Sequence, residues 1–219
     1  MVPVSTKGKE YLVTEPKKAE ESVRERIMKA AMTAFMEQGY AGTSTLEIAT
    51  RAKVSKRDIY GEFGNKQALL AACIATRSQR MRPPGEIPPI ASREDLIATL
   101  TLFGKTTLLE VTHPQVIGVF RLAIAEAKRA PEVAQTVDNT GRAAVRTALR
   151  EVIQKGLAAG LIAGSMPEMA SEFASLLMKS SIMDILLGME EAPSAEEAER
   201  RAKRAAEAFL KLHGVGGTF

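Results

Sequence analysis

Two short segments of the chain place hydroxyl, cationic and aromatic side chains at or near a predicted helix start. Ser44 and Thr45 open the first segment, whereas Lys56 and Arg57 open the second, with Tyr60 one turn later. The unpaired N–H groups and the dipole at a helix N-terminus attract anions. These residue types at these points favour hydrogen bonds and ion pairs with a polyanion rather than covalent chemistry.

The residues that usually carry catalysis or hold metals are few. Cys73 is the only cysteine, and it follows Leu69 by four positions, so we expect a buried apolar side chain. The two histidines, His113 and His213, have no partner at the spacing of metal ligands. No glycine-rich phosphate loop is present. The sequence therefore predicts no enzyme, no metal and no cofactor.

A longer predicted helix precedes the two polar segments. Apolar residues recur from Val23 at the spacing of one helical face, and Gly39 suits the left-handed residue that closes a helix. We expect the inner faces of this helix and of the two segments to form a small core. Its predicted members are Ile27, Ala31, Phe35, Leu46, Ile48, Ala49, Val54, Ile59 and Phe63.

The two polar segments together have the pattern of a helix-turn-helix. Ser44 and Ser55 each begin a sequence with the spacing of a capping box, which predicts short helices over 45–52 and 56–62. Only Lys53 and Val54 separate the first helix from the capping residue Ser55. In such a motif the second helix enters the major groove of DNA.

Charge and proline content divide the chain into a basic first third and a larger remainder. Residues 1–80 hold 14 Lys and Arg against nine Asp and Glu, whereas residues 81–219 hold 16 against 17. A basic N-terminal module favours a polyanionic partner. We expect a flexible arm over 1–20, a helix-turn-helix domain over 21–66, a connecting helix over 67–81, a proline-rich loop over 82–91, a helical domain over 92–213 and a flexible tail over 214–219.

The larger part of the chain is predicted to be helical throughout. Helices are expected to start near Ser92, Pro114, Pro131, Ser165 and Ser194, and those from Pro131 and Ser165 to run unbroken to Leu157 and Leu187. Because no run alternates with period two, we predict an all-α fold: a three-helix DNA-binding domain followed by a larger helical domain.

Composition bounds the class of protein. The chain has 219 residues, of which 45% are hydrophobic and 26% charged, and this balance excludes wholesale disorder. The N-terminus has no apolar leader segment, and the stretch 156–166 is too short to span a bilayer. We expect a cytoplasmic protein with no membrane partner.

Four stretches of the first third form one extended pattern. They are Arg26–Ala31 with Phe35 and Gly39-Tyr40, Thr43–Ala49, Val54–Lys56 with Tyr60 and Phe63, and Asn65–Leu70. Over residues 24–72 this pattern resembles the tetracycline-repressor (TetR) family of transcriptional regulators. The stretches 113–121 and 126–131 are similar, less specifically, to the C-terminal part of its AefR-like subgroup. The resemblance implies an N-terminal domain that binds operator DNA and a helical C-terminal part that binds a small effector and dimerises.

The resemblance also implies which residues touch DNA. Thr45, Tyr60 and Lys66 would contact phosphates, and Lys56 and Arg57 would face bases or phosphates. The full set is Ser44, Thr45, Lys56, Arg57, Tyr60 and Lys66.

Three positions depart from the family pattern. Lys53 stands where the turn often has glycine, so we expect strain or a left-handed lysine. Glu62 stands where histidine is common, and we expect its carboxylate to point away from phosphate or to reduce affinity. Arg57 replaces a small residue, which would alter sequence preference.

The resemblance places an effector pocket and a dimer interface in the C-terminal part. The candidate pocket residues are Phe103, Thr106, Thr107, Phe120, Phe173 and Met178. The candidate interface residues, on the helices from Ser165 and Ser194, are Leu177, Ile185, Ala198, Ala202, Ala205 and Phe209. Each candidate pocket side chain, taken singly, also fits a plain core. A small apolar or amphipathic effector would tilt the connecting helix and release the homodimer from double-stranded operator DNA.

A second hypothesis stays open on the sequence alone. The chain also fits a helical dimer that binds a partner protein and carries a vestigial DNA-binding domain. A gel shift against the protein's own upstream DNA separates the two hypotheses.

Overall fold

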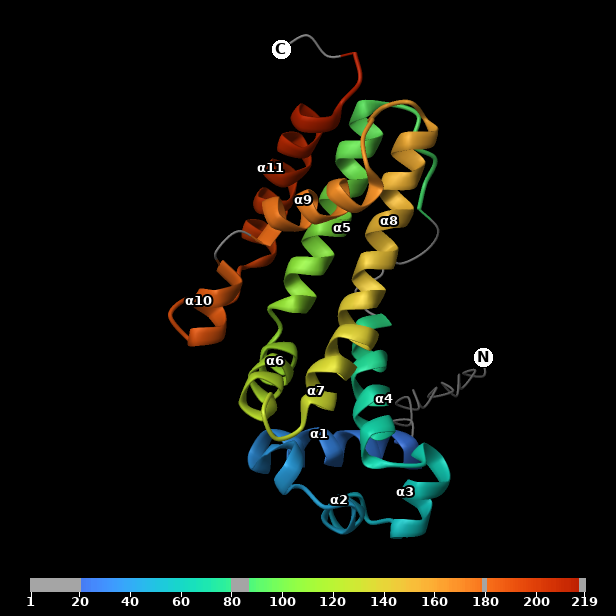
Figure 1. Cartoon of the computed structure of the whole chain (residues 1–219), viewed down its shortest axis with the longest axis vertical. Helices are drawn as coiled ribbons and strands as arrows, with labels where there is room; N and C mark the ends of the chain where they lie inside the picture. Colours follow the sequence, from blue (N-terminus) through green and yellow to red (C-terminus); the bar gives the residue numbers. More distant parts are fainter. Residues whose placement is uncertain (1–20, 80–86, 179–180, 217–219) are drawn as a thin grey trace, which may run out of the picture.

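The computed structural model describes residues 21–79, 87–178 and 181–216, and every regular element within these ranges is helical. Figure 1 shows an elongated molecule in which α1, α2 and α3 lie across one end and the other helices extend away from it. The predicted all-α fold is confirmed. The elements are α1 (Val23–Gly42), α2 (Thr45–Ala52), α3 (Lys56–Phe63), α4 (Lys66–Ser78), α5 (Arg93–Val111), α6 (Pro114–Glu126), α7 (Pro131–Thr136), the π-helical segment η2 (Val137–Arg142), α8 (Ala143–Ala158), α9 (Met166–Met178), α10 (Ser181–Leu187) and α11 (Ala195–His213).

Local sequence signals explain where the head helices begin and end. We call α1 to α4 the head and α5 to α11 the body. A capping box of Ser22 and Glu25 starts α1. Gly39 has the expected positive φ of 78°, but with ψ 165° it is not left-handed helical, and it kinks the helix instead of closing it. The chain then continues as a last helical turn to Gly42. This turn brings the buried ring of Tyr40 to 5.4 Å from the centroid of Phe35.

The core of the head extends into the body. Ile27, Phe35 and Ile59 are fully buried in one apolar cluster, which also contains Val133 of α7 and Val137 of η2. A second cluster fills the space between α5, α8, α9 and α11. The head therefore packs directly on α6, α7 and η2.

The axis of the body is a close pair of helices, α5 and α11. A Cβ atom at Gly104 of α5 would lie 2.9 Å from the Cβ of Ala202 of α11. Glycine opposite alanine thus lets the two backbones approach closely, and the pair lies side by side along the upper part of Figure 1.

Three expectations for the body need correction. The helix expected to run from Pro131 to Leu157 contains the π-helical segment 137–142, which the spacing of its apolar residues did not indicate. The helix expected over 165–187 divides into α9 and α10, with residues 179–180 outside the described ranges. The tail is anchored at its start, since Gly214 forms an isolated bridge with Ile162.

Other domain expectations fall partly outside the described residues. The arm over 1–20, residues 82–86 of the proline-rich loop and residues 217–219 of the tail all lie there. The connecting helix ends at Ser78 in α4, and residues 80–81 lie outside the described ranges as well.

Candidate nucleic-acid interface

The helix pair α2–α3 is held by its own caps. The Ser44 hydroxyl accepts from the Glu47 amide at 3.1 Å, and the Ser55 hydroxyl accepts from the Asp58 amide at 3.1 Å. Only the second is a full capping box, because the Asp58 carboxylate accepts from the Ser55 amide at 2.7 Å. The Glu47 carboxylate instead accepts from Arg51. The side-chain hydrogen bond from Ser55 lowers the pKa of Asp58, and the backbone bond adds to this.

The turn between α2 and α3 depends on a left-handed lysine. Lys53 has φ 54° and ψ 49°, as expected for a position that is often glycine. It is the only non-glycine residue with positive φ within the described ranges. A non-glycine side chain costs about 1–2 kcal/mol in this conformation. The strain is local and leaves the buried faces of both helices turned toward α1.

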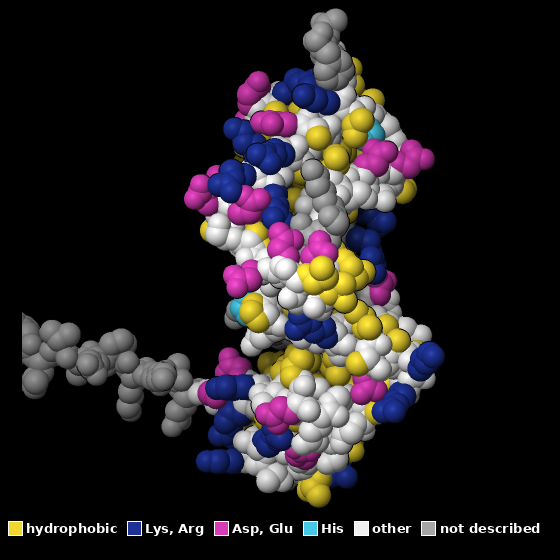
Figure 2. Space-filling view, turned by 90° about the vertical axis from the view of Figure 1, so that its left-hand side faces the viewer, with side chains coloured by type: hydrophobic (Ala, Val, Ile, Leu, Met, Phe, Trp, Pro, Cys, Tyr) yellow, Lys and Arg dark blue, Asp and Glu magenta, His cyan; other side chains and the backbone are white. Residues whose placement is uncertain are grey.

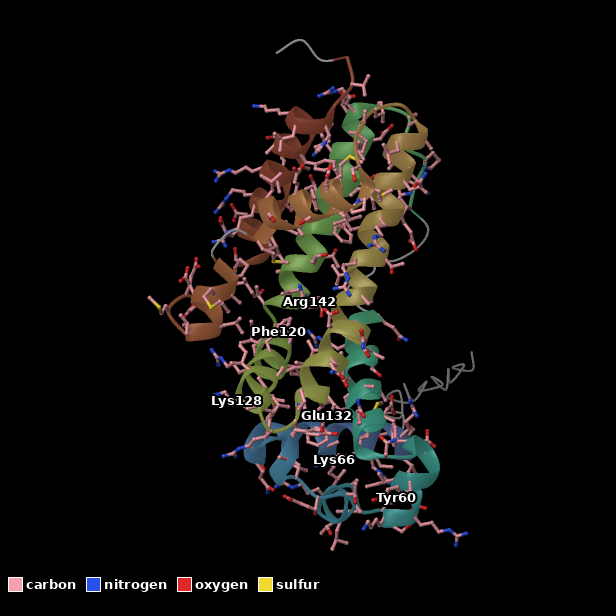
Figure 3. All side chains as sticks on the ribbon, in the orientation of Figure 1. Tyr60, Lys66, Phe120, Lys128, Glu132 and Arg142 are labelled. Carbon is pink, nitrogen blue, oxygen red and sulfur yellow. The ribbon has the colours of Figure 1, made fainter. Side chains whose placement is uncertain are left out.

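The outer face of the pair gathers three side chains at one place. Tyr60 is 44% exposed, and its hydroxyl lies 3.3 Å from the Thr45 hydroxyl on the neighbouring helix. The Lys56 ammonium lies 5.6 Å from the centroid of the Tyr60 ring. Arg57 and Ser44 are also exposed. Figure 3 shows Tyr60 on α3, on the side of the head away from the body.

One expected core residue lies on this outer surface. Leu46 is 64% exposed, whereas Ile48 and Ala49 beside it are buried. Leu46 lies on the flank of α2, off the face that carries the buried residues Ile48, Ala49 and Ala52. Leu46 thus belongs to the surface that carries Thr45 and Tyr60.

Lys66 does not present its ammonium on this surface. Its Nζ donates to the carbonyl oxygen of Tyr40 at 2.7 Å and to that of Thr43 at 3.0 Å, and it lies 4.4 Å from the centroid of the Tyr40 ring. Burial lowers the pKa of Lys66, against the attraction of Glu126 and Glu132. The expected phosphate contact through this ammonium is corrected: the carbonyls at the end of α1 are nearer and already bind it. Figure 3 shows Lys66 within the head, between the level of α1 and that of α2.

Glu62 points away from the outer face. This is one of the two outcomes expected from the sequence, the other being a reduced affinity for phosphate. Its carboxylate lies 2.7 Å from the Arg24 guanidinium at the start of α1. Arg24 in turn stacks over the ring of Phe63, at 4.7 Å from its centroid. This pair neutralises the carboxylate and keeps it from opposing the cationic surface.

A cavity of about 630 Å³ lies between the head and the body. Its walls come from α1, α4, α6, η2 and the adjoining ends of α5 and α8. Among the six expected pocket residues only Phe120 lines it. Figure 3 places Phe120 on α6 and Arg142 at the end of η2, at the level where the body joins the head.

The other five expected pocket residues need reassignment. Phe103 and Phe173 pack ring against ring, with centroids 6.2 Å apart, in the second apolar cluster. Thr107 is buried, Thr106 is half-buried on α5, and Met178 packs at the edge of the same cluster. Helical spacing indicated that these residues face inward, but the body packs tightly around them and the open space lies nearer the head.

The expected interface residues are likewise inside the protomer. Ala198, Ala202 and Phe209 are fully buried, because the apolar face of α11 packs on α5 and α9. Ala205, Leu177 and Ile185 are buried as well. The small residues of α11 do allow close helix approach, but to α5 of the same chain. These six side chains cannot meet a second copy.

The remaining candidates for chemistry have structural partners. Burial raises the pKa of the Cys73 thiol to about 12. His113 caps α6, with Nδ1 accepting from the Gln115 amide at 3.2 Å, and His213 pairs with Glu172. Within the part of the chain that the structure describes, no group of three His, Cys, Asp or Glu side chains could hold a metal.

Within the described ranges, no single helix is both long and apolar enough to cross a bilayer. Helices α5 and α6 together meet the criterion by length and composition, with a bend of 63° between them.

Comparison with known proteins agrees with this architecture. The profile of the family described as bacterial regulatory proteins, tetR family, matches residues 27–73, and that of the AefR-like transcriptional repressor C-terminal domain matches residues 98–215. A TetR regulator from Agrobacterium tumefaciens is 27% identical with a TM-score of 0.75, over 89% of this chain and 96% of that one. The flavonoid-responsive regulator FrrA is 27% identical with a TM-score of 0.73, over 89% and 98%.

Curated relatives match over a shorter range. The HTH-type transcriptional regulator YvkB of Bacillus subtilis strain 168 is 36% identical over 88 residues, which are 40% of this chain and 44% of that protein. The match thus spans less than half of that relative. The two profiles together cover both the head and most of the body. The chain therefore belongs to the TetR family of bacterial regulatory proteins, with an AefR-like repressor domain as its C-terminal part.

Proposed function

We propose that the protein is a transcriptional regulator that binds operator DNA through α2 and α3. The carrying observation is the outer surface on which Thr45, Tyr60 and Lys56 meet, opposite the apolar faces that pack on α1. In this proposal α3 enters the major groove. Thr45 and Tyr60 contact phosphates, with Ser44 beside them, whereas Lys56 and Arg57 reach base edges or phosphates.

A titration of DNA tests this proposal. Fluorescence anisotropy with labelled fragments from upstream of the protein's own gene, at low ionic strength, should give a saturable complex that weakens as salt rises. Tyr60→Phe should weaken binding to every sequence, whereas Arg57→Ala should change which sequence is preferred. Lys211→Ala, an exposed cation on α11 far from the head, is the matched control. The proposal fails if no fragment binds, or if all three variants act alike on every sequence.

We also propose that the protein acts as a homodimer through a surface centred on α10. This helix is fixed to the body because Arg121 of α6 donates to the carbonyls of Ile185 and Leu186 at 3.1 and 2.9 Å. Met183 and Leu187 on α10 are nevertheless more than half exposed. Figure 2 looks onto this face and shows hydrophobic side chains gathered in its middle. Exposed apolar patches of this kind mark protein contacts.

Ultracentrifugation at micromolar concentration tests the dimer. The wild type should sediment as a dimer, and Leu187→Asp should shift it to monomer. Leu212→Asp changes an equally exposed leucine on α11, outside the patch, and should leave the dimer intact. A monomeric wild type, or a dimeric Leu187→Asp, contradicts the proposal. In a dimer that binds one operator, two-fold symmetry would set the two α3 helices about 34–36 Å apart, or a multiple of that.

We further propose that a small effector releases the protein from its operator, as a repressor requires. The cavity between the head and the body supports this proposal, because α1 and α4 of the head and several helices of the body line it together. Addition of an effector should then lower DNA affinity in the same anisotropy assay. By linkage, DNA should weaken effector binding by the same factor.

A further inference from the structure

The cavity between the head and the body has a largely apolar lining. One wall is a stripe of methionines on α1, Met28, Met32 and Met36, spaced by one helical turn each. Opposite walls come from valines and Phe120 of the body. Methionine side chains are flexible and polarisable, so such a wall adapts to apolar ligands of different shape. The volume of about 630 Å³ lies in the usual range for small-molecule sites.

The charged side chains at this cavity are paired. Lys29 lies 3.6 Å from Glu21, and Glu37 lies 2.6 Å from Arg51. Arg142 lies 3.1 Å from Asp138, and Arg77 lies 2.9 Å from Glu110. An ionised ligand would have to displace one of these partners and lose its own hydration. The pairing therefore favours a neutral occupant.

One polar atom at the cavity has no partner within the described residues. Arg77 is mostly buried, and its Nη2 faces Glu110 while its Nη1 donates to Gln115 at 3.3 Å. Its Nε, however, is buried without a hydrogen bond. A buried N–H donor without an acceptor is unfavourable, and a ligand oxygen would relieve it.

The backbone of the same wall is irregular. The π-helical segment η2 supplies Val137, Gly141 and Arg142 to the cavity. π-turns in helices are frequent at functional sites. A Cβ atom at Gly141 would lie 3.3 Å from a methyl carbon of Ile74 on α4, so this segment already touches the connecting helix.

We propose that this cavity is a binding site for a neutral, largely apolar small molecule that carries an oxygen acceptor, such as a carbonyl, bonded by Arg77 Nε. The site lies between the head and the body, rather than within the upper body where the sequence suggested it. Its occupant touches α1 and α4 of the head together with α6 and η2, so binding changes how the head sits on the body. The further consequence, that the bound molecule changes DNA affinity, rests on the proposed function.

The neutral naphthalene ketone prodan is a suitable probe, because its fluorescence rises and shifts to the blue in an apolar site. Titration of the full-length protein should give one saturable site. Methyl 2-naphthoate should displace prodan at least tenfold more effectively than 2-naphthoate at pH 7.5, since the two differ by one charge. Preference for the carboxylate, or no saturable binding of prodan, overturns the proposal.

Three variants locate the site. Val116→Trp projects a large ring into the cavity from α6 and should weaken prodan binding at least tenfold, whereas Leu212→Trp, on an exposed part of α11, should not. Arg77→Lys keeps a cation beside Glu110 but removes Nε. It should weaken binding of the ester about fivefold to tenfold and leave 2-ethylnaphthalene, which has no acceptor, unchanged. Equal prodan binding by Val116→Trp and wild type, with circular dichroism showing both folded, refutes the location.

The same protein samples separate this inference from the proposed function. Prodan binding without any DNA complex would leave the ligand site standing and refute the DNA-binding proposal. A DNA complex without prodan binding would refute the ligand site and leave the DNA-binding proposal standing. Where both occur, saturating methyl 2-naphthoate should lower DNA affinity at least fivefold in wild type and not in Val116→Trp.

Discussion

Lys66 offers a sharp test of how the head is assembled. We expect Lys66→Met to destabilise the protein by about 2–3 kcal/mol. The substitution keeps an apolar stem but removes two hydrogen bonds from the ammonium, at 2.7 and 3.0 Å, to the carbonyls of Tyr40 and Thr43. Each bond to a charged group contributes about 1.5–3 kcal/mol, and the contact with the Tyr40 ring adds about 0.5–1 kcal/mol.

The expected loss of stability is smaller than the sum of these contributions, because burial of the Lys66 ammonium also carries a cost. Burial lowers the pKa of Lys66, so the charged form is disfavoured in the folded state relative to water. Methionine relieves that cost but leaves two carbonyls at the end of α1 without this donor. The loss of stability therefore comes from the orphaned carbonyls, and it should be present at neutral pH.

Urea unfolding followed by circular dichroism at pH 7 and one fixed protein concentration measures the effect. Lys56→Met is the matched control, because Lys56 is exposed and should change the free energy of unfolding by less than about 0.5 kcal/mol. DNA titrations distinguish the two roles of the lysines. Lys56→Met should reduce the slope of log K against log salt concentration by about one, and Lys66→Met should leave this slope unchanged. A Lys66→Met protein with wild-type stability and a reduced salt dependence would refute the inward role.

Four further outcomes follow from the geometry. Lys53→Gly should raise the free energy of unfolding by about 1 kcal/mol in urea, because glycine adopts φ 54° without the side-chain strain. Asp58→Asn should lower the melting temperature at pH 7, and the difference from wild type should shrink as pH falls below the ordinary Asp pKa of 3.8, since the hydrogen bonds from Ser55 hold the folded-state pKa below that value. Cys73, whose thiol pKa is about 12, should react with iodoacetamide at pH 8 only as urea unfolds the protein; fast labelling of the native state would contradict its burial. Phe209→Ala should cost about 3–5 kcal/mol in urea unfolding while the folded fraction still sediments as the wild type does, because its ring is fully buried in the protomer, 5.6 Å from the centroid of Phe173.

Much of the head could be predicted from short stretches of sequence. The starts of α2 and α3, the positive φ of Lys53 and the kink at Gly39 each depend on a few neighbouring residues. A serine three residues before the amide that it accepts from specifies a helix start wherever the chain goes afterwards. For the same reason the exposed positions of Lys56, Arg57 and Tyr60 on α3 could be anticipated.

The candidate sites of the body could be predicted far less well. Helical spacing identified Phe103, Phe173 and Phe209 as inward-facing, yet it could not say whether they line a cavity or pack against one another. That depends on how far apart α5, α9 and α11 lie, which no single helix encodes. From the sequence alone the apolar face of α11 fits an interface between copies equally well, because its partner in the structure, α5, is about a hundred residues away in sequence.

Local sequence therefore specified the starts of the head helices, the serines that cap them and the polar edge of α3, because these depend on residues within one or two turns of each other. The tertiary structure alone decided that Lys66 turns inward, that Leu46 is exposed and that the open space adjoins α1. Each of these depends on which distant surface lies opposite a side chain, and such pairings are set by the packing of the whole chain.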